Sequence, residues 1–366
     1  GDNIISSYAQ AYLATNLRWE KTKAWEVGFE MQMFNQRLHI EPTYYSKKTE
    51  DLICYLESFM GAQDGLINSG SIRNRGFELT LETVNVKTRQ FQWSTSFNIA
   101  FNRNRILGLV DGQNTLQSSV SWETRFNSQF PYISQVGKPT GMMYGFIYDG
   151  TYKAEDFDDK GNLISGVPSF KGNAMQPGDM KYRDMNGDGV IDDYDRTIIG
   201  CGQPLNTGGF GNNFNWKNFD LNVLVNFTIG RKMINNRMGL GFSTQSENGH
   251  LTKLFDYRKL RPWDGVNKNP NAPAWGNSLS MNTDSAIEKV HHLALKQITL
   301  GYNLPDRISK KAGFSGVRFF LTAENLFYLS NYSGGNPEVV NIYTGRDNGD
   351  TYPLPRKYTL GLTLNF

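Results

Sequence analysis

The chain has 366 residues, and its 38 basic and 35 acidic side chains leave a formal net charge of +3. This balance gives no argument for nucleic acid as a partner, because proteins that bind it usually carry a strongly basic surface. No stretch holds the roughly 18 apolar residues that a membrane-spanning helix needs, whereas aromatic residues are abundant, with 23 Phe and 18 Tyr.

Alternation of apolar and polar residues is the dominant pattern, and it begins near the N-terminus. Residues 24–34 place five apolar side chains on one face: Trp25, Val27, Phe29, Met31 and Met33. Asn35-Gln36 predicts a tight turn, after which the chain returns through a second alternating segment at 38–45. Segments of about ten residues with a period of two are typical of strands in membrane barrels.

The same pattern predicts nine more strands along the rest of the chain. They are 77–82, 91–102, 126–137, 142–152, 205–215, 219–230, 290–304, 316–329 and 356–366. The short connections between predicted strands are 35–36, 87–90, 138–141, 216–218 and 305–315, the last with room for one helical turn. The long connections are 51–70, 107–125, 153–204, 231–289 and 330–355.

Short and long connections alternate, as they do in outer-membrane barrels, which have short periplasmic turns and long extracellular loops. We therefore predict an all-β fold, an antiparallel transmembrane β-barrel wall of about eleven strands. The last predicted strand supports this fold, because it alternates up to a terminal Phe366. A terminal phenylalanine on such a strand is similar to the signal that outer-membrane proteins present for assembly, although an edge strand of a soluble sandwich also tolerates it.

The odd number of predicted strands indicates that the barrel is incomplete. Single-chain bacterial barrels have an even number of strands. Unpaired strand edges in lipid cost several kcal/mol for each exposed polar group. We therefore expect residues 1–366 to form the C-terminal half of a barrel domain, with the missing strands N-terminal to Gly1.

Eight short motifs follow one another along the chain. They are 17–20 (LRWE), 44–52 (YYSKKTEDL), 73–79 (RNRGFEL), 136–139 (VGKP), 177–182 (PGDMKY), 184–189 (DMNGDG), 324–327 (ENLF) and 334–338 (GGNPE). This series resembles the SusC-like (RagA-like) TonB-dependent outer-membrane transporters of Bacteroidetes. The resemblance implies a barrel of about twenty-two strands, of which this chain would supply about half.

The resemblance also implies a function and partners. A transporter of this type imports a nutrient, an oligosaccharide or a peptide fragment, together with a SusD-like surface lipoprotein. Its plug domain and the segment that contacts TonB precede the barrel, so the contact with TonB would use a region outside residues 1–366. No residue of this chain is assigned to the substrate.

The strongest local motif is an Asp-rich segment in the predicted extracellular loop 153–204, and it fits the template of a calcium-binding loop. The template ligands are Asp184, Asn186, Asp188, Val190 (through its carbonyl), Asp192 and Asp195. Gly189 permits the sharp turn at the sixth position. No amphipathic helix flanks the segment, so we predict a structural Ca²⁺ site rather than a sensor. An Asx-rich turn without metal is the alternative.

Other chemistry is not indicated. The sequence shows no nucleophile elbow, phosphate-binding loop or zinc-binding helix, so we assign no catalytic residue and expect no enzyme. Cys54 and Cys201 match no zinc or redox spacing, which leaves a disulfide or two separate thiols. The glycine-rich run 208–211 predicts a glycine kink or a close backbone approach within a strand.

Two further alternatives remain open. The predicted loops contain four aromatic residues that could contact a ligand, although we favour packing of loop against loop or a place in the membrane girdle: Trp263, Trp275, Tyr332 and Tyr343. The alternative function is a calcium-dependent, surface-exposed binding protein or adhesin. Such a protein would fold alone as a soluble β-sandwich.

Overall fold

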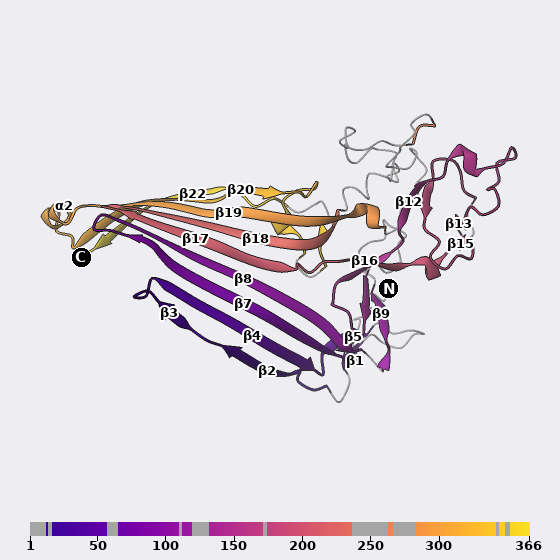
Figure 1. The fold of residues 1–366 in the computed structure, drawn as a ribbon, viewed down its shortest axis with the longest axis horizontal. Helices are drawn as coiled ribbons and strands as arrows, with labels where there is room; N and C mark the ends of the chain where they lie inside the picture. The colour runs from indigo at the N-terminus through magenta and orange to yellow at the C-terminus, as the bar shows by residue number, and fades with distance from the viewer. Residues whose placement is uncertain are drawn as a thin grey trace, which may run out of the picture.

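The computed structural model describes residues 12–13, 17–56, 65–109, 112–118, 132–170, 174–235, 263–265, 283–341, 344–347 and 352–366 (Figure 1). Long strands lie side by side in one sheet, and most of the short elements gather at one end of it. None of the described helices is long and apolar enough to cross a bilayer.

The large sheet is one layer. Its strands are β2 (Lys21–Gly28), β3 (Met31–Met33), β4 (Leu38–Glu50), β7 (Ser71–Lys87), β8 (Phe91–Gly108), β17 (Asn206–Trp216), β18 (Phe219–Asn235), β19 (Ile287–Asn303), β20 (Gly316–Ser330), β21 (Arg346–Asp347) and β22 (Lys357–Asn365). The hydrogen-bonded order is β2-β4-β7-β8-β17-β18-β19-β20-β22, while β3 pairs with β4 and β21 pairs with β18. The strands of this path follow one another in the sequence and are antiparallel, which is the up-and-down order of a barrel wall and confirms the predicted architecture.

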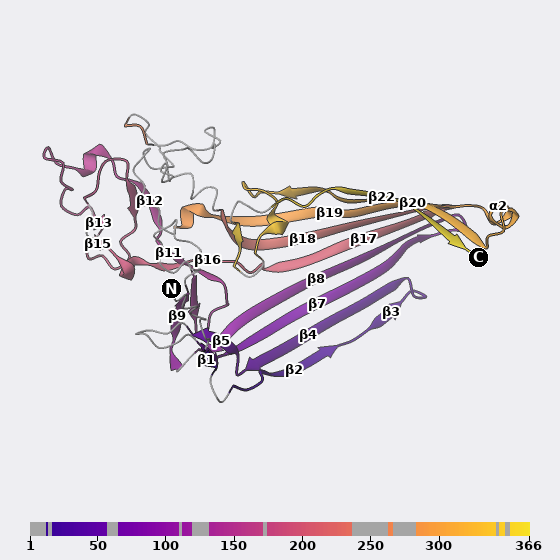
Figure 2. The same cartoon turned by 180° about the vertical axis from the view of Figure 1, so that it is seen from behind.

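The two ends of the sheet differ in their connections (Figures 1 and 2). One end, which we call the turn end, holds the short turns at 34–37, 88–90 and 217–218, the helix α2 (Asp306–Lys311) and the C-terminal residue Phe366. The opposite end, the loop end, holds the connections from β4 to β7, β8 to β17, β18 to β19 and β20 to β22. Short and long connections therefore alternate, as the sequence predicts.

The turn after β3 shows why the sequence folds back there. Phe34, Asn35 and Gln36 have φ values of 54°, 56° and 62°, in the left-handed region. Asn is among the few residues that adopt this conformation at low cost, which explains its place in a tight hairpin.

One face of the sheet is apolar because the strand register places apolar residues of neighbouring strands directly opposite one another. Near the turn end, one aromatic row crosses five strands: Phe91, Trp216, Phe219, Tyr302 and Phe319. Nearer the loop end, a second row joins Tyr44, Phe77 and Phe101. Aromatic girdles at both edges of an apolar band are a feature of outer-membrane barrels.

The apolar face is also uncovered. Leu360 on β22 is 81% exposed and Val27 on β2 is 66% exposed. A soluble sandwich would bury this face against a second sheet, whereas no second layer covers it within the part of the chain that the structure describes. The sheet is therefore a barrel wall whose apolar face is suited to lipid.

Two of the predicted barrel strands are wrong. The sheet contains eleven strands, but the segments 126–137 and 142–152 are not among them, because β8 pairs directly with β17. Residues 126–131 lie outside the described residues, and the described part of the two segments forms β10 (Tyr132–Gln135), β11 (Met142–Gly145) and β12 (Tyr148–Thr151). A membrane strand needs about 9–11 residues, so these four-residue strands are too short to span. The predicted periplasmic turn 138–141 consequently lies at the loop end.

Residues 112–118, 132–170 and 174–205 form what we call the loop module. Its strands are β9 (Thr115–Ser118), β10, β11, β12, β13 (Ser169–Phe170), β14 (Met180–Tyr182), β15 (Val190–Ile191) and β16 (Thr197–Cys201). The order β16-β11-β10-β9 forms one small sheet, and β12-β14 and β13-β15 form two pairs. Their apolar residues build two small cores, one around Tyr182 and one around Met143, which accounts for the alternation that the sequence shows there.

Three further strands and four 3₁₀ helices complete the described structure. The strands β1 (Tyr12–Leu13), β6 (Gly65–Asn68) and β5 (Ile53–Leu56) form a separate sheet at the loop end. The 3₁₀ helices are η2 (Ala154–Asp156), η3 (Asp193–Asp195), η4 (Asp284–Ala286) and η5 (Pro337–Val339).

Candidate functional site

The face of the sheet opposite the apolar band is polar. Near the turn end it carries a hollow of about 510 Å³, whose polar lining residues are Ser94, Asn213, Asn215, Asp220, Asn222, Thr299 and Arg318. They come from β8, β17, β18, β19 and β20, so five neighbouring strands contribute to one surface. Since the apolar face is the outer one, this polar surface belongs to the barrel interior.

An ion pair organises the hollow. Arg318 on β20 donates from Nη2 to Asp220 Oδ2 on β18 at 2.5 Å and from Nε to Asp220 Oδ1 at 3.2 Å. The two strands are not neighbours, and the pair crosses β19 above Gly301. A Cβ atom at Gly301 would lie 2.4 Å from Asp220 Oδ1 and 2.5 Å from Arg318 Nη2. The absence of a side chain at Gly301 therefore allows the pair to form.

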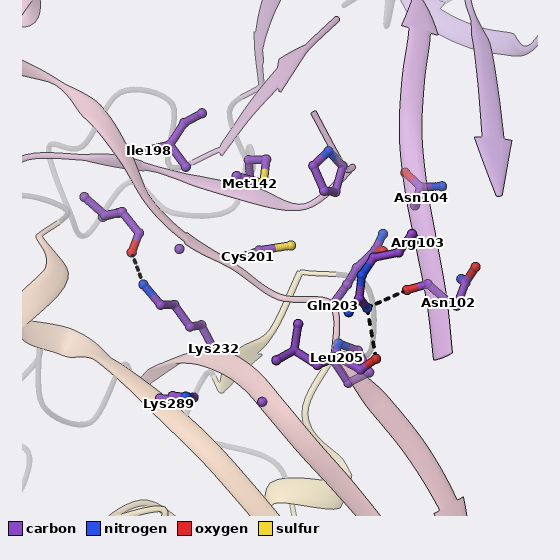
Figure 3. A pocket seen from close by; sticks show the side chains of 15 residues that line it. Asn102, Arg103, Asn104, Met142, Ile198, Cys201, Gln203, Leu205, Lys232 and Lys289 are labelled. Atoms are coloured by element: carbon purple, nitrogen blue, oxygen red, sulfur yellow. Dashed lines mark hydrogen bonds between the residues drawn. The ribbon is translucent and has the colours of Figure 1, made fainter. Parts of the chain in front are cut away.

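A second hollow, of about 560 Å³, lies where the barrel rim meets the loop module (Figure 3). Met142, Ile198 and Cys201 of the module line one part of it, and Arg103 and Lys289 of the barrel strands line another. Cys201 is a free thiol in this wall. The side chain of Cys54 lies outside the described residues. Of the two predicted alternatives, a disulfide or two separate thiols, the structure therefore shows only that Cys201 is a free thiol.

The loop end of β18 fastens the loops to the barrel. Lys232 Nζ donates to the Ile199 carbonyl at 3.0 Å, and Arg231 Nε donates to the Gly202 carbonyl at 2.9 Å. Arg231, which is 5% exposed, also donates through Nη2 to the carbonyl of Asn341. One buried guanidinium therefore joins two long connections at the rim.

The Asp-rich segment forms one compact turn in the loop module, and the structure places all six template residues in it. Asp184 Oδ1 accepts from the Gly187 amide at 2.6 Å, and its Oδ2 accepts from the Gly189 amide at 2.8 Å. Asp195 is fully buried. Its two carboxylate oxygens accept from the amides of Met185 and Asp192, each at 2.8 Å, which closes the loop.

The remaining template residues also bond within the loop. Asn186 Oδ1 accepts from the Asp188 amide at 3.0 Å, and Asp188 Oδ1 accepts from the Val190 amide at 2.8 Å. Asp192 caps the helix η3 by accepting from the Tyr194 amide at 2.9 Å. Within the described ranges, no group of three or more His, Cys, Asp or Glu side chains is placed to hold a metal ion. The template itself draws on two other kinds of ligand, an amide oxygen and a backbone carbonyl.

Electrostatics keep the loop negatively charged. Hydrogen bonds from the backbone amides of Gly189 and Gly187 hold the pKa of Asp184 below its ordinary value. This carboxylate is therefore ionised at neutral pH and available to a cation. Nearby, burial raises the pKa of Tyr148 and Tyr152 to about 12, so both phenols are neutral and serve as packing groups.

Of the four aromatic residues predicted to pack loops, Tyr332 does so, whereas Trp263 is half-buried and belongs to none of the described hydrophobic cores. Tyr332 is 8% exposed, lies in a core with Met233 and Val290, and donates from its hydroxyl to Asp347 Oδ2 at 2.7 Å. Trp275 and Tyr343 lie outside the described residues. The inner-wall pair Asp220 and Arg318 was not predicted, because the two residues are 98 positions apart in the sequence and only the strand register brings them together.

Comparison with known proteins decides the family. Residues 2–228 match the family described as "TonB dependent receptor-like, beta-barrel". The chain belongs to this family. The predicted resemblance, the transmembrane β-barrel fold and the outer-membrane localisation are confirmed, and the family is one of receptors and transporters rather than enzymes.

The curated relatives of this TonB-dependent receptor chain are longer. TonB-dependent receptor P3 of Formosa agariphila is 30% identical over 379 residues, which cover 100% of this chain and 36% of the relative. TonB-dependent receptor SusC of Bacteroides thetaiotaomicron is 27% identical over 377 residues, which cover 100% of this chain and 34% of the relative. The chain therefore spans about a third of the length of the curated relatives that it matches.

A solved structure, that of the RagAB peptide transporter, has the same fold. It aligns with a TM-score of 0.74 at 24% identity and covers 95% of this chain and 36% of the transporter chain. The RagAB peptide importer in the 'open-open' state aligns with a TM-score of 0.70. This likeness supports the open barrel wall described above.

Proposed function

We propose that the complete receptor imports a nutrient across the outer membrane, together with a SusD-like lipoprotein and with energy supplied through TonB. The polar inner wall around Asp220 and Arg318 is the observation that carries the proposal. A sheet that is apolar outside and polar inside can enclose a water-filled path, and the family to which the chain belongs consists of TonB-dependent receptors.

The class of nutrient is part of the same proposal. The RagAB relative is described as a peptide transporter, which makes a peptide fragment the first substrate to test, and an oligosaccharide is the second. Both classes are rich in hydrogen-bonding groups and suit the amide and hydroxyl side chains of the inner wall. TonB would contact a region of the receptor that lies outside this chain.

The test compares two tryptophan variants on one strand. Thr299 lines the inner hollow and its neighbour Leu300 faces outward, 47% exposed. In a strain that lacks the chromosomal gene, the full-length receptor is expected to restore growth on a peptide digest or on an oligosaccharide mixture as the sole nutrient. Thr299→Trp should lower uptake several-fold by narrowing the path, while Leu300→Trp should behave as the wild type. Wild-type receptor that restores uptake of neither class would overturn the proposal.

We also propose that the loop 184–195 binds calcium as a structural ion. Support comes from the donor set, in which carboxylates, one amide and one carbonyl share a single turn, and from the ionised state of Asp184. Asp188 is exposed on the loop surface, where a cation can reach it. Calcium would replace repulsion between these carboxylates with a shared ligand. The ion would hold the module in shape above the barrel.

A further inference from the structure

Four arginines form a compact group at the loop end of β7 and β8. The two strands carry the same short sequence, Arg73-Asn74-Arg75 on β7 and Arg103-Asn104-Arg105 on β8. In the sheet register, Arg73 lies opposite Arg105 and Arg75 lies opposite Arg103. We call these four residues the arginine block.

The arginine block faces outward, on the lipid side of the wall. Phe77 and Phe101, two residues further along their strands, are directly opposite each other with ring centroids 6.4 Å apart, and they belong to the outer apolar face. Alternate residues of a strand share a face, and the register between Arg73 and Phe77 is continuous. The asparagines between the arginines face inward, where Asn104 Nδ2 donates to Asn74 Oδ1 at 2.7 Å.

The height of the arginine block above the apolar band is fixed by β8. The outward aromatic residues of this strand run from Phe91 to Phe101, ten residues apart. At ~3.3 Å per residue and a tilt of about 40°, ten residues rise about 25 Å, which is the usual height of the apolar band. Arg103 is the next outward residue, so the arginine block lies at the level of the lipid headgroups.

Among the described residues, no acidic side chain neutralises the arginine block. A neighbouring outward group, Lys23 and Lys48, shares the carboxylate of Glu50. By contrast, none of the four arginines forms an ion pair with an acidic side chain in the described parts of the chain. Arg103 Nη1 instead donates to the carbonyls of Asn102 and Leu205 at 3.1 and 3.0 Å (Figure 3).

An anionic ligand would explain this arrangement. Like charges directly opposite each other destabilise a pair of strands, and the arginine block contains two such pairs. Arg75, Arg103 and Arg105 are exposed, so their guanidinium groups can reach a ligand from the membrane surface. Guanidinium groups bind phosphate with paired hydrogen bonds, in a geometry that a lysine cannot offer.

We propose that the arginine block binds the phosphate groups of a phosphorylated lipid in the leaflet from which the loops project. This inference rests on the proposed function only for the orientation of the barrel in the outer membrane. The charge and the position at headgroup level carry the rest, together with the lack of acidic partners among the residues that the structure describes. The lipid would neutralise the like-charge pairs and hold the loop end of β7 and β8 at the membrane surface.

The test measures lipid retention by the full-length receptor in non-ionic detergent, with native mass spectrometry. The probe is bis-phosphorylated lipid A, compared with the same lipid after removal of its phosphates and with free pyrophosphate as a competitor. Wild-type protein should retain the phosphorylated lipid, and Arg75→Gln/Arg103→Gln should retain at least tenfold less. Arg89→Gln/Lys217→Gln is the matched control, since it removes two exposed cations at the turn end.

A conservative variant and a folding check make the result specific. Arg75→Lys/Arg103→Lys keeps the charge but loses the paired hydrogen bonds, so its retention should be intermediate. Heat-modifiable migration on gels shows that each variant is folded. Three results would overturn this inference. The glutamine variant could retain as much lipid as the wild type, the wild type could retain the dephosphorylated lipid equally well, or pyrophosphate could displace the lipid completely. Failure of nutrient uptake by wild-type receptor would overturn the proposed function instead.

Discussion

Gly208 shows how much one residue decides in a tightly paired sheet. It lies on the outer face of β17, between Ile99 of β8 and Phe227 of β18. A Cβ atom at Gly208 would lie 2.3 Å from the Asn98 carbonyl oxygen and 2.6 Å from the Phe227 ring. The sequence predicts a kink or a close backbone approach at this glycine run, and the structure shows the close approach.

Gly208→Ala should therefore destabilise the barrel by about 1–3 kcal/mol, since the added methyl group meets backbone that cannot move away. Gly108→Ala is the control, because its Cβ would meet only Ser71 Oγ at 3.5 Å, an ordinary contact. Urea unfolding of the full-length protein in detergent, followed by gel mobility, measures the difference. Equal midpoints for the two variants would contradict this explanation.

Asp188→Ala should remove one proposed calcium ligand and leave the barrel strands intact. At about 5 mM Ca²⁺, above the 10⁻⁴ to 10⁻³ M range of extracellular calcium modules, the wild-type loop module should resist protease better than it does with chelator. The variant should lose this difference. Asp193→Asn, in the same loop but outside the template positions, should keep it. Wild-type protease resistance that does not respond to calcium would exclude a structural ion.

Acid should loosen the same loop. The pKa of Asp184 is lower in the folded loop than in an unfolded chain, because the amides of Gly189 and Gly187 bond to its charged form. The stabilisation is present above the unfolded pKa and is lost as pH falls through the lower, folded pKa. Protease sensitivity of the module should therefore rise below about pH 4, near the unfolded value, and Asp184→Asn should show the loosened state already at neutral pH.

At the scale of elements, sequence periodicity correctly predicts the strands whose alternating apolar face extends over about ten residues or more. The segments at 91–102, 205–215, 219–230, 290–304, 316–329 and 356–366 all correspond to strands of the sheet. The prediction at 77–82 is too short, since β7 extends from Ser71 to Lys87. Arg73 and Arg75 interrupt the apolar face there, so the pattern ends before the strand does.

The candidate sites also differ in how far the sequence alone predicts them. The Asp-rich loop is recognisable because its donors are local in sequence. The inner-wall ion pair, the rim contacts of Arg231 and the arginine block depend on which strands are neighbours. Sequence alone gives the wrong neighbours for β8, because the alternation at 126–152 belongs to the small cores of the loop module.

Arg231→Met should loosen the attachment of the loop module to the rim of β18, where the Lys232 bond to the Ile199 carbonyl remains. The buried guanidinium bonds to the carbonyls of Gly202 and Asn341, and loss of a hydrogen bond to a charged group costs about 1.5–3 kcal/mol. Limited proteolysis of the module should be about tenfold faster or more, with unchanged heat modifiability of the barrel. Lys289→Met, an exposed cation at the same rim, should leave the cleavage rate at the wild-type value.

At the scale of the whole molecule, the separation of short turns from long loops predicts the orientation in the membrane. After replacement of Cys54 and Cys201, Thr88→Cys places a thiol in a turn at the turn end, and Tyr194→Cys places one at an 82% exposed position in the loop module. An impermeant thiol reagent applied to whole cells should label Tyr194→Cys and spare Thr88→Cys. The reverse labelling pattern would invert the proposed orientation.

The direct pairing of β8 with β17 has a consequence for the order of folding. Ala100 and Thr207 are paired although they lie 107 positions apart in the sequence, and closing a free loop of that size costs about 4 kcal/mol in chain entropy. Contacts within the connection shorten the path. Ile106 pairs with Gly137 and Lys138, and Gly202 bonds to Gly141. Once these contacts exist, about fifteen residues of chain connect Ala100 to Thr207, and the entropy cost falls by about 2 kcal/mol. We therefore expect the loop module to form early and to bring β8 and β17 together. Deletion of the module would then slow the pairing of these two strands, even at positions that the module does not contact.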